Sequence, residues 1–124
     1  MTAPSAYARL GLRVADITGG TASVDLVPDL DAADGDGGVH LAVIAGLAQA
    51  AIEQAIGSTL DGDRGAAFDL KLTRVRPLAA GTAARATARV VHRGRTTAVA
   101  ECRVVAGADT LIATASGTAA IASG

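Results

Sequence analysis

Aromatic side chains are almost missing from this chain of 124 residues, which has no tryptophan, one tyrosine (Tyr7) and one phenylalanine (Phe68). Proteins that bind nucleic acids commonly combine stacking aromatics with a basic surface. This chain instead has 11 basic and 12 acidic side chains, which give a formal net charge of −1. We therefore expect no nucleic-acid partner.

Cysteine occurs once, as Cys102, so the sequence offers neither a disulfide framework nor a thiolate zinc site. No run of residues is long and apolar enough to cross a bilayer. The segment Met1–Leu10 also lacks the basic start and apolar core of a secretory signal. These absences predict a soluble, cytoplasmic protein that binds no metal and has no membrane partner.

Small apolar residues make up much of the chain: half of the sequence is apolar, mainly alanine, valine and leucine, and 19% is charged. Such a composition predicts a folded chain rather than a disordered one. The length predicts a single domain, residues 1–124, with a core of small side chains.

The first third of the chain predicts a helical turn, a hairpin and a loop. The helical turn is expected at Ser5–Leu10. Two short strands, Val14–Ile17 and Ala22–Val27, flank Gly19-Gly20, a pair that is typical of a hairpin turn. The stretch Pro28–Gly38 is rich in aspartate and glycine and predicts a loop. It does not match the calcium-binding loop that requires a glutamate at its twelfth position.

A long helix is expected next, from Val39 to Ile56, with Gly57 as its stop. Small and aliphatic residues surround its whole circumference, which predicts a buried helix. Gln49 and Glu53 interrupt this pattern. They are four positions apart and therefore share a face, and polar groups in a buried helix need partners.

The remaining chain alternates with a period of two, which predicts four longer strands. Their apolar faces are Phe68, Leu70 and Leu72; Ala84, Ala86, Ala88 and Val90; Ala98, Ala100, Cys102 and Val104; and Leu111, Ala113 and Ala115, in a strand that ends near Ile121. Strands joined by short turns are antiparallel. The order of elements predicts the α+β class, with an antiparallel sheet curled around the helix.

Three strings in this order resemble the hotdog-fold acyl-coenzyme A (acyl-CoA) thioesterases of the phenylacetate-degradation type. They are the loop, histidine and small-residue helix of Gly35–Ala51, the Arg76-Pro77 pair followed by Gly81, and the hairpin Val90–Ala98. The resemblance implies an antiparallel sheet wrapped around one long central helix. It also implies hydrolysis of acyl-CoA by homodimers joined at their sheet edges, or by dimers of dimers. Coenzyme A would be part of the substrate, and no other cofactor is expected.

The family's site has a loop amide, then a histidine followed by two glycines, then an acid nine residues after the histidine. With that histidine aligned on His40, Leu41 and Ala42 replace the glycines, Gln49 replaces the acid, and Asp34 replaces the loop amide. Gln49 cannot act as nucleophile or general base. One carboxylate and one amide are nevertheless still present, in exchanged positions.

A second thioesterase branch of this fold places its catalytic aspartate in the loop, in a string similar to Asp34–Val39. The resemblance therefore implies that Asp34 or Asp36 is the base or nucleophile and that Gln49 orients water or substrate. Glu53 is the other candidate, because one helical turn brings it near the same site. Direct attack on the carbonyl carbon and activation of water both stay open.

The amides near Leu41 and Ala42 lack partners inside the helix, so they are candidates to stabilise the oxyanion of a tetrahedral intermediate. The alternative is that Asp36 or water caps them. His40 is a candidate to orient the loop, to line the pocket or to take part directly in acid–base catalysis. The alternative is that backbone groups satisfy its ring.

The resemblance also implies that basic residues near the strand ends bind the phosphates of coenzyme A, since arginine offers phosphate a planar fork of donors. The candidates are Arg76, Arg93, Gly94 and Arg95. The alternative is that these arginines are merely solvated. Cys102 lies on an apolar strand face and is expected to be an inert, buried thiol.

Three rival functions remain. The replacement of the family's acid by Gln49 supports a protein that binds acyl thioesters but hydrolyses them poorly. A module that binds a protein partner without any thioester is a second rival. A hydratase of the same fold ranks last, because Asp36–His40 is one residue shorter than the hydratase string and lacks its asparagine.

Overall fold

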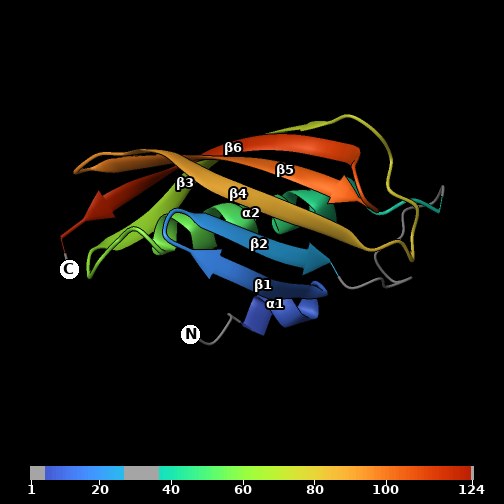
Figure 1. The fold of residues 1–124 in the computed structure, drawn as a ribbon, viewed down its shortest axis with the longest axis horizontal. Helices are drawn as coiled ribbons and strands as arrows, with labels where there is room; N and C mark the ends of the chain where they lie inside the picture. Colours follow the sequence, from blue (N-terminus) through green and yellow to red (C-terminus); the bar gives the residue numbers. More distant parts are fainter. Residues whose placement is uncertain (1–4, 27–36, 124) are drawn as a thin grey trace.

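The strands of the computed structural model, which describes residues 5–26 and 37–123, form one six-stranded antiparallel sheet. The elements in chain order are α1 (Ser5–Arg9), β1 (Leu12–Thr18), β2 (Thr21–Leu26), α2 (Leu41–Gly57), β3 (Arg64–Arg74), β4 (Ala84–Arg93), β5 (Thr97–Ala106) and β6 (Thr110–Ala122). Across the sheet the order is β1-β2-β4-β5-β6-β3. Figure 1 shows α2 behind the strands and α1 beside β1. The predicted α+β order of elements is therefore confirmed.

The hairpin between β1 and β2 turns at Gly19 and Gly20, as the sequence predicts. Gly20 has φ 83°, a conformation that glycine adopts without steric cost. Most of the predicted loop, up to residue 36, and the end of the predicted strand at Val27 lie outside the described residues. The same holds for the side chain of Phe68.

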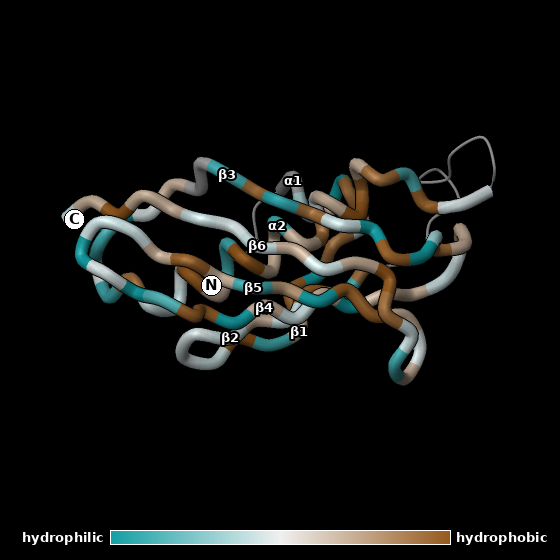
Figure 2. Tube along the Cα trace, turned by 90° about the horizontal axis from the view of Figure 1, so that it is seen from above, coloured by the Kyte–Doolittle hydropathy of each residue, from teal (hydrophilic) through white to brown (hydrophobic). Residues whose placement is uncertain are grey.

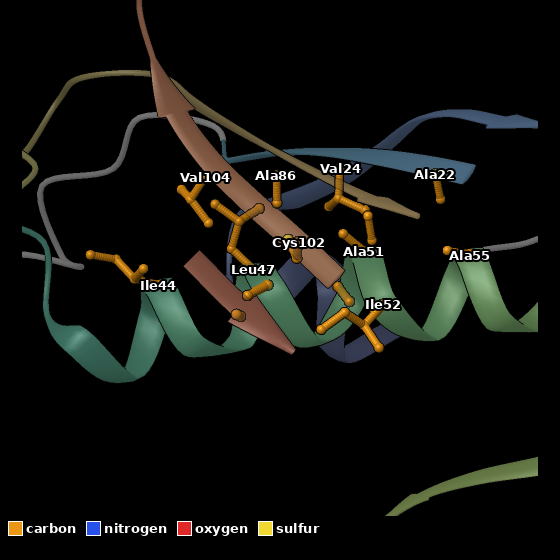
Figure 3. Packing of buried hydrophobic residues seen from close by; sticks show 14 of the residues in the cluster. Ala22, Val24, Ile44, Leu47, Ala51, Ile52, Ala55, Ala86, Cys102 and Val104 are labelled. Atoms are coloured by element: carbon orange, nitrogen blue, oxygen red, sulfur yellow. The ribbon is translucent and has the colours of Figure 1, made fainter. Parts of the chain in front are cut away.

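Helix α2 packs against the concave face of the sheet, mainly on β2, β4 and β5. Figure 3 shows where the side chains of the helix and the sheet meet, among them Ile44, Leu47, Ala51, Ile52, Val24, Ala86, Cys102 and Val104. The alternation along the strands, visible as teal and brown segments in Figure 2, brings one face of each strand into this core. As a result, the buried side of β4 and β5 consists largely of alanine.

The prediction that α2 is buried on all sides is wrong for the single chain. Ala42 and Gln49 are exposed, and Ala45, Gly46 and Glu53 are half-buried. These positions form one stripe along the helix, on the side that the sheet does not cover. The sequence misleads here because alanine and glycine on this stripe are as apolar as those facing the sheet.

The end of α2 also differs from expectation, because Gly57 is the last helical residue rather than a left-handed stop. Ser58 follows as the C-cap with a right-handed conformation, φ −68°. The chain reverses later, at Asp61 and Gly62, whose φ values are 53° and 95°.

Among the described strands, four of the five pairings contain a register shift. In β3 the shift lies between Ala67 and Asp69. Between β5 and β6 the shift lies at Val104/Val105, and next to it both Ile112 and Ala113 are buried whereas Leu111 is only half-buried. The predicted strict alternation from Leu111 is therefore wrong at that residue.

No helix in the described parts of the chain is long and apolar enough to span a membrane.

Gly117 of β6 lies in close contact with Ile52 of α2. A Cβ atom on Gly117 would lie 3.1 Å from Cγ2 of Ile52 and 3.3 Å from the backbone oxygen of Asp69. We expect Gly117→Ala to lower the free energy of unfolding by about 1 kcal/mol or more, because the added methyl overpacks the contact. Urea unfolding measures this.

Gly57→Ala is the matched control, because a Cβ there has no heavy atom within 4 Å and alanine is favoured over glycine in a helix by about 1 kcal/mol. The control should be neutral or stabilising. Equal losses in both variants would show that the contact at Gly117 does not limit the helix–sheet distance.

Cys102 faces the core with 3% of its surface exposed, and burial raises the pKa of its thiol to about 12. The native protein should therefore not react with a disulfide reagent such as DTNB at pH 8, since the thiolate is the reactive form. One thiol per chain should become reactive in urea. Rapid labelling of the native protein would contradict the packing described for β5.

Candidate functional site

A hollow of about 400 Å³ lies between α2 and the sheet edge at β3, and we call it the α2–β3 hollow. Its polar wall is formed by Gln49, Glu53 and Gln54, and its apolar wall includes Ile52, Ile56 and Leu60. Small residues of β3 and β6 complete it. A concave, mainly apolar space with a few polar groups is the usual form of a small-molecule site.

The two polar residues that interrupt the helix bind each other at this hollow. Gln49 Nε2 donates a hydrogen bond of 2.7 Å to Glu53 Oε1. The predicted shared face is therefore confirmed, and each residue is a partner for the other. The amide fixes one oxygen of the carboxylate and leaves the group beside the apolar wall.

Tyr7 of α1 completes this arrangement, and the sequence pattern gave no signal for it. Its hydroxyl donates to Glu53 Oε2 over 3.4 Å and accepts from Gln54 Nε2 over 3.3 Å. Burial, followed by the nearby Glu53 carboxylate, raises the pKa of Tyr7 above its usual 10.0, although the bond from Gln54 opposes this. The phenol thus keeps its proton at neutral pH.

The start of α2 is held by a side-chain cap and by backbone hydrogen bonds to the segment that follows β3 in the sequence. His40 Nδ1 accepts a hydrogen bond of 3.0 Å from the Ala42 amide. Just before the cap, the Val39 amide donates to Leu78 O over 2.7 Å and the Ala80 amide donates to Gly37 O over 2.9 Å.

The two amides at the helix start therefore differ. The Ala42 amide is already engaged by His40, whereas the Leu41 amide has no acceptor among the described residues. Leu41 itself is 44% exposed. Asp34 and Asp36, the loop carboxylates named from the sequence, lie outside the described residues.

The four residues predicted to bind the phosphates of coenzyme A differ in how far other groups of the chain already bind them. Arg93 donates to Asp63 Oδ2 over 3.2 Å, to Thr59 O over 3.3 Å and to Gly94 O. A Cβ on Gly94 would lie 3.1 Å from the His92 ring, so glycine permits the tight hairpin. These contacts tie the β4–β5 hairpin to the segment after α2.

Arg76 and Arg95 are both exposed. Arg76 donates to Leu111 O over 2.9 Å. Within the described parts of the chain, Arg95 has no hydrogen-bond or charged partner. Arg95 is thus the more open of these two side chains to a ligand.

A second hollow, of about 450 Å³, lies at the outer face and is lined in part by Arg13, Asp25 and Arg85. Its charges satisfy one another, since Arg85 donates to both oxygens of Asp25 over 2.6 and 3.0 Å. The Arg85 guanidinium is the main reason that the pKa of Asp25 lies below its usual value. The groups form a cross-strand pair, so the α2–β3 hollow is the better candidate site. Residues 5–26 and 37–123 contain no cluster of three metal-ligating side chains.

Residues 36–113 match the family model of the thioesterase superfamily, a segment that begins five residues before α2 and ends in β6. No curated protein sequence matches the chain. Several solved structures have the same fold. A conserved protein of Pseudomonas aeruginosa superposes with a TM-score of 0.91 and 26% identity, over 97% of this chain and 95% of that one.

Two phenylacetic acid degradation proteins are also similar. The Escherichia coli protein has a TM-score of 0.91 and 25% identity, over 98% of this chain and 86% of that one. A mutant of the Thermus thermophilus protein has a TM-score of 0.87 and 29% identity, over 94% of this chain and 98% of that one. The curled antiparallel sheet with a single long helix confirms the predicted hotdog fold.

The cap at His40 gives a prediction for stability. His40→Ala removes the acceptor of the Ala42 amide and should lower the free energy of unfolding by about 1 kcal/mol, as the loss of other N-caps does. His40→Asn supplies a side-chain oxygen at the same position and should restore most of the loss. Chemical unfolding of the three proteins measures this, and equal stability of all three would show that the cap does not contribute.

Proposed function

Because this chain belongs to the thioesterase superfamily, we propose that it hydrolyses acyl-CoA thioesters and binds the acyl group in the α2–β3 hollow. The apolar wall of Ile52, Ile56 and Leu60 supports an acyl group without charge. Two similar structures are phenylacetic acid degradation proteins, which makes aromatic acyl groups the first to test. The proposed location is the cytoplasm, where a lone cysteine stays reduced.

The observation that carries this proposal is the Glu53 carboxylate, held by Gln49 at the hollow. As a general base, Glu53 would take a proton from water as the water oxygen bonds to the thioester carbon. The tetrahedral intermediate would then expel the coenzyme A thiolate, which takes up a proton. As a nucleophile, a Glu53 oxygen would bond to the thioester carbon and expel the coenzyme A thiolate, and water would then hydrolyse the resulting anhydride to the free acid and the Glu53 carboxylate. In either route Gln49 orients the reacting group.

The oxyanion in this reaction needs a donor, and the Leu41 amide is the proposed one. Leu41 and Glu53 are twelve residues apart on α2, which corresponds to about 18 Å along the axis. A single thioester carbonyl cannot reach both groups of one helix. The proposal therefore requires two chains, with the helix start of one copy near Glu53 of the other.

Two features support such a homodimer. Strand β3 is at the edge of the sheet and pairs only with β6 among the described strands. The uncovered stripe of α2, which includes Gln49, borders the α2–β3 hollow next to this edge. A second copy added at β3 would extend the sheet and bring the two stripes together, and two such dimers would form the proposed tetramer.

Coenzyme A would be bound as part of the substrate, with no separate cofactor. Arg95 is the proposed phosphate ligand, since its guanidinium is exposed and open. Arg76 lies beside Leu111, at the opposite end of β6 from the hairpin of Arg95, so within one chain it cannot bind the same phosphate. Arg93 and Gly94 would shape the hairpin that carries Arg95, because Arg93 is engaged by Asp63.

A second candidate function is binding of an acyl thioester without hydrolysis. The hydrogen bond from the Ala42 amide to His40 favours it, since that amide is then not available to an oxyanion. The replacement of the family's acid by Gln49 favours it as well.

Release of thiol from short aliphatic, aromatic and long-chain acyl-CoA esters tests the proposal, with DTNB as the reporter. Glu53→Gln should lower kcat by about 10²-fold or more, the usual contribution of a general base. Asp109→Asn is the matched control, because Asp109 is an exposed carboxylate in the β5–β6 turn, and it should keep wild-type activity.

Asp34→Asn and Asp36→Asn decide between the helix and the loop. Full activity in both supports Glu53. Loss in either one, with Glu53→Gln active, would move the working carboxylate to the loop. Retention of acyl-CoA without turnover would support the second candidate function, and neither binding nor turnover across the panel would overturn both.

A further inference from the structure

Tyr7 is an unusual residue in this protein because a large phenol ring is packed into a core of small side chains. It is the only tyrosine of the chain, and 7% of its surface is exposed. It comes from α1, a helix of five residues. The catalytic steps proposed above do not use it.

The N-terminal segment lies along one border of the stripe of α2 that the sheet leaves uncovered, so that Ala42 and Gln49 stay exposed. Leu10 Cδ1 lies 3.5 Å from the place where a Cβ on Gly46 would stand. Tyr7 reaches the same helix two turns later, at Glu53 and Gln54. The segment therefore contacts α2 at the level of the polar wall of the hollow.

The direction of the hydrogen bonds assigns the phenol proton. Gln54 Nε2 donates to the phenol oxygen over 3.3 Å, so this contact uses the phenol as an acceptor. The phenol proton is directed to Glu53 Oε2 over 3.4 Å. Gln49 donates to the other oxygen, Oε1, over 2.7 Å. Each oxygen of the carboxylate thus has its own donor.

Two hydrogen-bond donors fix the orientation of the Glu53 carboxylate, whereas one donor leaves it free to rotate. The terminal torsion of a glutamate is broad, so a carboxylate held at one oxygen still turns about its last bond. A second donor on the other oxygen fixes the plane of the group. A base or nucleophile must be held in a reactive orientation, since small misplacements lower rates strongly.

We propose that Tyr7 is a positioning residue, which fixes the plane of the Glu53 carboxylate at the α2–β3 hollow. This inference rests on the proposed function, in which Glu53 reacts. Tyr7 contacts no substrate and acts through Glu53. The first helix of the chain thereby becomes part of the hydrolytic site.

The contact itself is testable without any substrate. The chain has no tryptophan and one tyrosine, so the ultraviolet absorbance of tyrosinate reports Tyr7 alone. Its titration midpoint should lie above 10.0 in the folded protein. Glu53→Gln should lower the midpoint, because it removes a negative charge that opposes formation of tyrosinate. An unchanged midpoint in Glu53→Gln would overturn the contact and with it the inference.

Kinetics of Tyr7→Phe test the positioning. The ring and its packing remain, and only the hydroxyl is lost. We expect kcat to fall between about tenfold and a hundredfold, the value of roughly one hydrogen bond to a charged group, with KM nearly unchanged. A fall in kcat without a rise in KM is the signature of positioning, since a distorted hollow would raise KM as well.

Ser58→Ala is the matched control for Tyr7→Phe. It removes the hydroxyl of the residue that caps the end of α2. That hydroxyl accepts from the Gly20 amide over 2.8 Å and donates to Ala55 O over 2.6 Å. The Ser58 hydroxyl has no hydrogen bond to Glu53, so both kcat and the Tyr7 midpoint should stay as in the wild type.

The outcomes separate this inference from the proposed function. If Glu53→Gln is inactive while Tyr7→Phe keeps the wild-type kcat, hydrolysis by Glu53 stands and the role of Tyr7 is overturned. If Glu53→Gln keeps full activity, the inference fails although hydrolysis stands. A wild type without turnover overturns both.

Discussion

The distance between α2 and the sheet is the constraint on which the rest of the structure depends. Gly117 and the alanines of β4 and β5 let the helix lie close to the strands, with Ile52 directly over Gly117. Because interiors are close-packed, larger residues on either surface would move the helix away from the strands. The stripe of α2 that carries Gln49 and Glu53 would then lose its place beside β3. The position of the candidate site is thus set by small residues that take no part in it.

Much of the fold is predictable from the sequence because apolar and polar residues alternate along the central strands. Every second residue is buried from Ala84 to Ala88 in β4 and from Ala98 to Ala106 in β5. The helix is recognisable from its small residues, but its uncovered stripe is not. Alanine and glycine are tolerated against a sheet, against a second helix and at an exposed surface. Composition therefore does not tell which side of α2 the sheet covers.

The candidate site is less predictable than the fold. The pairing of Gln49 with Glu53 follows from helical spacing alone, and the structure has that hydrogen bond. Tyr7 is 46 residues away from Glu53 in the sequence, and a single aromatic in a five-residue helix produces no periodic signal. The capping bond between His40 and Ala42 depends on a side-chain torsion that residue order does not specify. Contacts between distant segments and local side-chain orientations are therefore what the sequence left open.

The register shift between Ala67 and Asp69 bears on the behaviour of the protein at high concentration. A bulge in an edge strand bends it and interrupts the row of backbone groups that an added strand would use. An incoming strand can keep its hydrogen bonds in phase on one side of the shift and loses them on the other. The edge at β3 therefore disfavours the indiscriminate stacking of strands that leads to fibres, while a partner with a matching irregularity pairs along its whole length. Another copy of the same chain carries that irregularity at the same two residues.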